Sequence, residues 1–76
     1  MGDVRLEWLA EEVMAGLPSA GARAEVQDLL VDVAGHPGRW PAPGGEEVLD
    51  AFGARCWISC VAYLDGLEVR DIGWAD

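Results

Sequence analysis

The chain has 76 residues, of which 51% are hydrophobic, and a formal net charge of −9. A chain of this length buries one small core, so we expect a single domain over residues 1–76, and the apolar content excludes a disordered tail. Fourteen acidic residues against five arginines disfavour binding to nucleic acid or to an anionic membrane and favour a basic protein partner.

The N-terminal segment fits two patterns. Apolar and charged residues alternate from Val4 to Trp8, as in a half-buried strand, but apolar residues also recur at helical spacing over the same segment. We expect a short strand at 4–8 that leads into a helix at about 9–16. A single helix from Asp3 is the alternative.

Residues 19–35 carry the clearest helical pattern. Ser19 is placed to cap the N-terminus, and Gly35 is placed to end the helix. One side carries an apolar stripe and another side an acidic ridge. The stripe consists of Ala22, Val26, Leu29, Leu30, Val33 and Ala34, and the ridge of Glu25, Asp28 and Asp32. The ridge is either a solvated surface or a docking site for a cationic partner.

Residues 35–45 are rich in proline and glycine and predict a loop. Trp40 is expected to fold back over the edge of the core, and insertion into a partner is the alternative. We interpret His36 as a partner of the preceding helix C-terminus rather than as a catalyst.

The segment 46–52 is expected to form a short helical turn that ends at Gly53. Val48, Leu49 and Phe52 would share one side of this turn, and the acidic residues at its start suit the positive end of the helix dipole.

The last quarter of the chain predicts a β-hairpin. Two β-prone runs flank Asp65-Gly66, a dipeptide typical of a two-residue type I′ turn. Such a turn would pair Leu64 with Leu67, and Trp57 with Trp74. The face expected to cover the helices consists of Ile58, Cys60, Ala62, Leu64, Leu67 and Val69.

The opposite face of this hairpin combines aromatic, aliphatic and charged side chains. It would hold Trp57, Val61, Tyr63, Glu68, Arg70, Ile72 and Trp74. Either the loop covers this face, or the face binds another chain, which includes a second copy in a homodimer. The candidate partner-binding residues are therefore Trp57, Tyr63, Arg70 and Trp74, together with Glu25, Asp28 and Asp32 of the acidic ridge.

Cys56 and Cys60 lie four residues apart in one predicted strand. Their Cα atoms would be roughly 13 Å apart, which is too far for a disulfide. Free buried thiols suit a reducing cytosol. Because no signal-peptide pattern and no membrane-length apolar run occurs, we expect a cytoplasmic protein.

The sequence offers little for catalysis. Two cysteines and one distant histidine do not form a zinc-ligand pattern, and a glycine-rich phosphate loop followed by lysine is missing. We therefore predict no metal and no cofactor, and we favour a protein that is not an enzyme.

The expected fold class is α+β. Two N-terminal helical segments would pack on a small C-terminal antiparallel sheet built around the 55–74 hairpin. The strand at 4–8 would be an addition to this sheet.

The order of these features, with the runs Gly53-Ala-Arg-Cys-Trp-Ile-Ser-Cys-Val-Ala-Tyr63 and Leu67-Glu-Val-Arg-Asp-Ile-Gly73, resembles the RelE/ParE superfamily of bacterial toxin–antitoxin systems. The resemblance covers roughly residues 26–75. It implies that Arg55 matches the arginine that contacts the cleaved RNA phosphate, so Arg55 is the candidate catalytic residue. Gly73 matches the glycine before the terminal catalytic pair, but Trp74 and Ala75 stand where cationic residues are expected.

These observations predict a divergent RelE/ParE-like protein of toxin–antitoxin type. It would act mainly by binding a protein such as an antitoxin, and the ribonuclease chemistry would be lost. The alternative is an acidic, non-enzymatic interaction module, such as an immunity protein, an inhibitor or a small regulator, that docks a basic partner.

Overall fold

The computed structural model describes residues 3–44 and 46–75. The elements in chain order are β1 (Asp3–Leu6), α1 (Trp8–Ala15), α2 (Ala20–Ala34), the 3-10 helix η1 (Pro37–Arg39), β2 (Leu49–Phe52), β3 (Cys56–Tyr63) and β4 (Gly66–Trp74). This is an α+β fold, as predicted. The short N-terminal strand and the helix after it are also confirmed, so a single helix from Asp3 is excluded.

The four strands form one sheet in the order β1-β4-β3-β2. β2, β3 and β4 are antiparallel, but β1 runs parallel to β4, with Val4 opposite Leu67. The C-terminal strands are antiparallel as expected, and the added N-terminal strand β1 makes the sheet mixed. The two helices lie between β1 and the remaining strands in the sequence, which allows this parallel return.

Helix α2 begins and ends where the sequence indicates. The Ser19 hydroxyl accepts a hydrogen bond of 3.0 Å from the Ala22 N–H, and Gly35 is the C-terminal cap. Ala22, Val26, Leu29 and Val33 are buried along one side of the helix. The apolar stripe is thus the surface that fixes α2 on the sheet.

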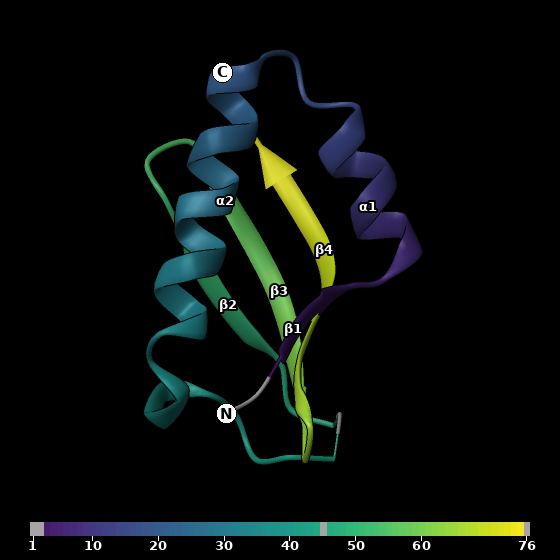
Figure 1. The fold of residues 1–76 in the computed structure, drawn as a ribbon, viewed down its shortest axis with the longest axis vertical. Helices are drawn as coiled ribbons and strands as arrows, with labels where there is room; N and C mark the ends of the chain where they lie inside the picture. Colours follow the sequence, from purple (N-terminus) through teal and green to yellow (C-terminus); the bar gives the residue numbers. More distant parts are fainter. Residues whose placement is uncertain (1–2, 45, 76) are drawn as a thin grey trace.

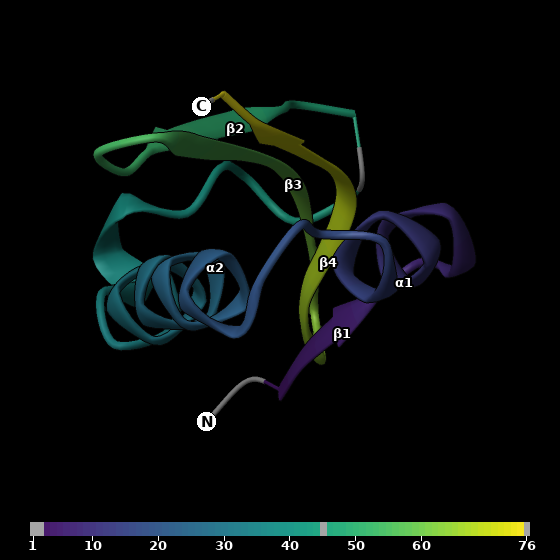
Figure 2. The same ribbon diagram turned by 90° about the horizontal axis from the view of Figure 1, so that it is seen from above.

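The helices and the sheet share one hydrophobic core. Figure 1 shows α2 on the left and α1 on the right, with β3 and β4 between them. Viewed from above in Figure 2, the sheet curves so that α2 lies in its concave side and α1 lies beside β4. Ile58, Cys60, Leu67 and Val69 supply the centre of this core with at most 1% exposure each.

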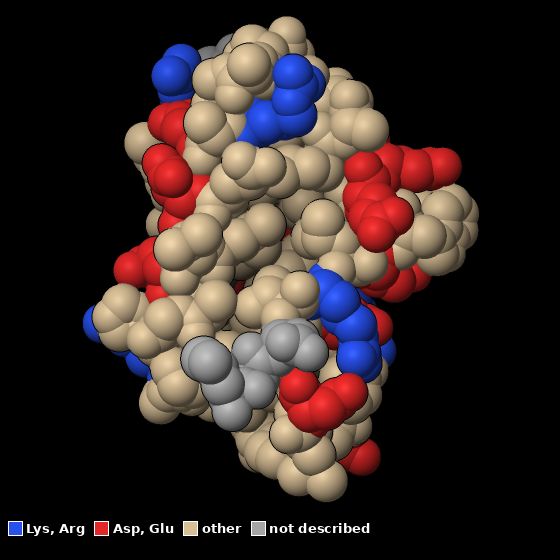
Figure 3. Space-filling view, viewed as in Figure 1, with Lys and Arg blue, Asp and Glu red and all other residues tan. Residues whose placement is uncertain are grey.

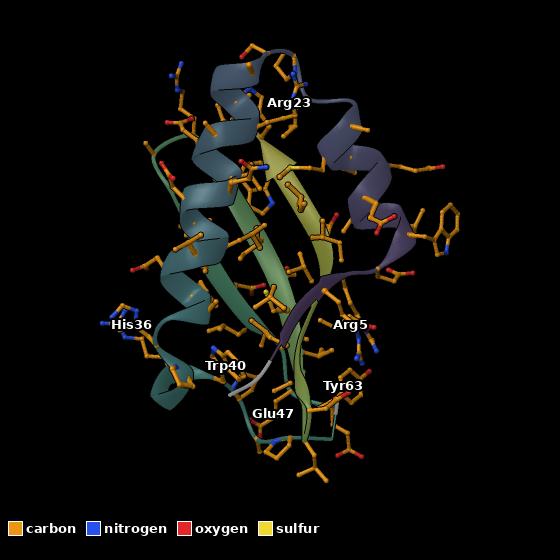
Figure 4. The ribbon with its side chains drawn as sticks, viewed as in Figure 1. Arg5, Arg23, His36, Trp40, Glu47 and Tyr63 are labelled. Carbon is orange, nitrogen blue, oxygen red and sulfur yellow. The ribbon has the colours of Figure 1, made fainter. Side chains whose placement is uncertain are left out.

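Trp40 anchors the loop after α2, as one of the two interpretations predicts. Its indole Nε1 donates a hydrogen bond of 2.8 Å to the Val33 carbonyl, and its ring packs against the core. Figure 4 shows the side chain beneath the end of α2. The loop therefore closes over the open end of the core.

The predicted helical turn at 46–52 is wrong, because Leu49–Phe52 form strand β2. Leu49 pairs with Cys60 and Ala51 with Ile58, so both lie on the core side of the sheet. Pairing with β3 partly buries these two side chains against the core and overrides the weak local preference for a helical turn.

The hairpin also forms in a different register from the predicted one. Leu64 and Asp65 form the turn with negative φ angles, and Gly66 takes a φ of 157° opposite Tyr63. The type I′ turn and the pairing of Leu64 with Leu67 are therefore wrong. Leu64 is 95% exposed instead of buried on the core side, because it lies in the turn at the tip of the hairpin.

A β-bulge changes the second half of this hairpin. Cys60 pairs with Val69 but Ser59 pairs with Asp71, which leaves Arg70 as the extra residue. Beyond the bulge, Ile72 and Trp74 lie on the core side rather than on the opposite face. The predicted pairing of Trp57 with Trp74 is therefore wrong.

Trp57 instead pairs with Gly73 and lies on it. A Cβ added to Gly73 would overlap the Cε2 atom of the Trp57 indole. Glycine at this position thus lets the aromatic ring lie flat on the neighbouring strand.

Replacing Gly73 with alanine should displace the Trp57 ring and lower the free energy of unfolding by about 1–3 kcal/mol. Urea unfolding of Gly73→Ala measures this loss. In a Trp57→Ala background the same substitution should cost less, because the overlapping ring is gone. Gly38→Ala is the control, since a Cβ there meets nothing within 4 Å. Equal losses in both backgrounds would contradict the stacked arrangement.

Candidate functional site

The candidate site lies on the face of the sheet opposite α2, which we call the outer face. Strand pairing places Asp50, Ser59 and Asp71 in one row across β2, β3 and β4. The next row contains Phe52, Trp57 and Gly73. We call Asp50, Phe52, Trp57 and Asp71 the aromatic–acidic patch.

The patch exposes large apolar surface beside two carboxylates. Phe52 is 73% exposed and Trp57 38% exposed, although Trp57 rests on Gly73. Asp50 accepts a hydrogen bond of 2.7 Å from the Ser59 hydroxyl, and Asp71 accepts one of 3.0 Å from the Ile72 N–H. Within residues 3–44 and 46–75, neither carboxylate has a cation within ion-pair distance.

The other end of the outer face carries the arginines. Arg70 Nε lies 3.0 Å from Glu68, and its Nη2 donates to the Tyr63 hydroxyl at 2.7 Å. Arg5 contacts Glu68 at 3.5 Å and Asp65 at 3.3 Å, and it lies over the Tyr63 ring. Figure 4 shows Arg5 and Tyr63 on the same side of the molecule. These arginines are therefore neutralised by acids of the same chain.

Of the predicted partner-binding residues, the structure brings Tyr63 and Arg70 together and leaves Trp57 in the patch. Hydrogen bonds with Glu68 and then with Tyr63 raise the pKa of Arg70, so its guanidinium stays charged. Trp74 lies on the core side, away from these three residues.

Arg55, the candidate catalytic residue, lies in the turn between β2 and β3. Its Nε is 3.8 Å from Glu25, and its guanidinium lies 5.4 Å from the centre of the Trp74 ring. Glu25 Oε2 is itself buried and accepts no hydrogen bond from the described residues. The nearby carboxylate offsets the positive charge of Arg55 and so disfavours contact with a phosphate.

The acidic ridge of α2 is only partly available. Glu25 is directed to Arg55, while Asp28 and Asp32 are exposed on the helix. Figure 3 shows acidic side chains along the left flank of α2. His36 Nδ1 lies 2.7 Å from the Asp32 carbonyl and 3.5 Å from its carboxylate, so His36 serves the helix C-terminus as interpreted.

A cavity of about 270 Å³ lies between α2 and β2. Its lining consists of Leu29, Asp32, Val33, His36, Arg39, Leu49, Asp50, Ala51 and Phe52. Apolar side chains form most of it, and charged groups stand among them. The cavity adjoins the aromatic–acidic patch because Asp50 and Phe52 belong to both.

Both cysteines are free and buried in β3. Burial raises the pKa of Cys60 to about 11, with a smaller contribution from Asp50. Burial and then Glu25 raise the pKa of Cys56. Both thiols therefore stay protonated at neutral pH and are poor nucleophiles.

Among the described residues, no three His, Cys, Asp or Glu side chains gather to hold a metal ion. None of the described helices is long and apolar enough to cross a membrane. Comparisons with protein-family models, with curated proteins and with solved structures found no match.

Sequence reasoning missed three of the four patch residues. The predicted helical turn gave Asp50 and Phe52 no place on the sheet. In the predicted register, which lacks the bulge, Asp71 would lie opposite Cys60 and so on the core side. The strand at Leu49–Phe52 has four residues, which is too short for a clear alternation.

Because the thiols are buried, we predict that the folded protein loses stability at alkaline pH. Cys60 in the unfolded chain ionises near its ordinary pKa of 9.0, but in the folded chain only near about 11. Its contribution to stability is complete below pH 9.0 and is lost as the pH rises to about 11. Urea unfolding across this range should show a steeper decline for the wild type than for Cys60→Ala. Parallel declines would contradict the raised pKa.

Proposed function

We propose that the protein is a non-catalytic binding module whose aromatic–acidic patch docks a basic segment of another protein. One observation carries this proposal, the uneven distribution of charge on the outer face. Arg5 and Arg70 are neutralised by their own neighbours at one end. Asp50 and Asp71 at the other end lack a described ion-pair partner and stand beside exposed aromatic rings.

The chemistry of the patch suits an arginine or a lysine of the partner. A carboxylate can pair with the cation while an aromatic face contacts it, and such cation–π contacts are worth about 0.5–2 kcal/mol. The net charge of −9 would also attract a basic partner at long range. Phe52 and Trp57 supply the apolar area whose burial would stabilise the complex.

The two cysteines, which are the potential nucleophiles, lie outside this patch. Cys56 and Cys60 are buried on the core side of the sheet, and their raised pKa values keep them protonated. Free thiols suit a reducing compartment, and we place the protein in the cytoplasm on that ground.

A toxin–antitoxin role and a role as immunity protein, inhibitor or regulator both use this kind of binding. The resemblance to the RelE/ParE superfamily supports the first role. The acidic charge and the patch support the second, and Arg55 beside Glu25 is a poor phosphate ligand. We therefore favour protein binding without RNA cleavage in either case.

Removing the two carboxylates of the patch should weaken binding of a basic segment. The probe is a short synthetic peptide of alternating arginine and valine. Titration calorimetry should show about a tenfold loss of affinity for the double variant Asp50→Asn/Asp71→Asn, which corresponds to about 1.4 kcal/mol. Binding to the wild type should weaken as salt is raised.

The matched control removes two charges from the helices. Glu11 and Glu12 are exposed on α1, and Glu11→Gln/Glu12→Gln changes the net charge by the same amount. This variant should bind almost as tightly as the wild type. If both double variants lose the same affinity, the peptide senses only net charge and the patch is not the site.

A further inference from the structure

The outer strand of the patch has a free edge. β2 pairs with β3 on one side, and the described part of the chain places no strand on its other side. The Gly53 N–H donates a hydrogen bond of 2.7 Å to the Cys56 carbonyl, which continues the β2–β3 ladder. Hydrogen-bonded positions alternate along an antiparallel ladder, so Leu49 and Ala51 bond to β3. The N–H and C=O groups of Asp50 and Phe52 therefore point outward.

The cavity follows this free edge. All four residues of β2 line it, including Asp50 and Phe52, whose side chains belong to the outer face. On its helix side the cavity is bounded by Leu29 and Val33 of α2. A strand laid along β2 would alternate its side chains between this cavity and the outer face.

The two sides of the edge would favour different side chains in such a strand. On the outer face they would meet Asp50 and Phe52, which suits basic residues. On the cavity side they would meet Leu29 and Val33, which suits apolar residues, while Asp32 and Arg39 in the same lining carry opposite charges.

The opposite edge of the sheet does not offer this arrangement. The outer-face residue in the middle of β1 is Arg5, which already pairs with Asp65 and Glu68, so no unpaired carboxylate stands there for a basic segment. An apolar groove also lies beside β1, but the basic chemistry of the proposed partner selects β2.

We propose that the basic partner segment binds as an added strand on the free edge of β2, with basic residues over the patch and apolar residues in the cavity. This inference rests on the proposed function and specifies its mode of binding. Backbone hydrogen bonds to Asp50 and Phe52 would fix the segment, and its alternating side chains would give specificity.

The test removes the outward hydrogen bonds but keeps the side chains comparable. Phe52→Pro deletes the outward N–H without touching the bonds to β3, and Phe52→Ala is its matched control. With the arginine–valine peptide, Phe52→Pro should bind about tenfold more weakly than Phe52→Ala. Circular dichroism and thermal unfolding check that both variants are folded.

A second measurement leaves the protein unchanged. The same peptide with N-methyl groups at alternate residues keeps its charge but loses half of its N–H donors. Two such peptides exist, one methylated at the odd and one at the even positions. Wild-type protein should bind one of them about tenfold more weakly than the unmodified peptide. This comparison decides the question even if Phe52→Pro fails to fold.

The outcomes separate this inference from the proposed function. If binding depends on Asp50 and Asp71 but both methylated peptides bind like the unmodified one, strand addition is wrong and surface docking stands. If binding is independent of these carboxylates, the proposed function is wrong as well. If sedimentation shows a dimer that the peptide dissociates, the edge is occupied by a second copy, which overturns the basic partner.

Discussion

The β-bulge at Arg70 is the constraint on which the outer face depends. Without the extra residue, Ile72 and Trp74 would stand on the outer face and Asp71 on the core side. With it, Ile72 and Trp74 join the core, and Asp71 aligns with Ser59 and Asp50. The bulge also brings Gly73 opposite Trp57. One inserted residue thus replaces Ile72 and Trp74 on the outer face with the carboxylate of Asp71 and a glycine under the Trp57 ring.

The parts of the fold set by local chemistry could be predicted from the sequence. The cap at Ser19 and the apolar stripe of α2 define that helix by themselves. The short N-terminal strand was also predicted, because alternation was visible over Val4–Trp8. The hairpin was recognised as such, since two β-prone runs meet at a turn.

The remaining parts depend on contacts between distant segments. The parallel pairing of β1 with β4 cannot be recognised from the local sequence. The four residues of β2 are too few to distinguish a strand from a helical turn. The register failed because Asp65-Gly66 suggested one turn while the chain uses Leu64 and Asp65 instead. That error misplaced Leu64 but left Leu67 and Val69 on the core side. The unpredicted β-bulge at Arg70 then reversed Ile72 and Trp74 and hid Asp71. The candidate site was therefore predicted only through Trp57, Tyr63 and Arg70.

The shortness of β2 limits what its edge can do. Asp50 and Phe52 alone direct backbone groups outward, so a chain without matching side chains gains few hydrogen bonds there. A longer apolar edge would template unlimited pairing of like strands and lead to aggregates. The carboxylate of Asp50 in the middle of the edge adds repulsion between copies of this acidic chain. The short, acidic edge therefore disfavours pairing between copies of the chain more than pairing with a basic strand.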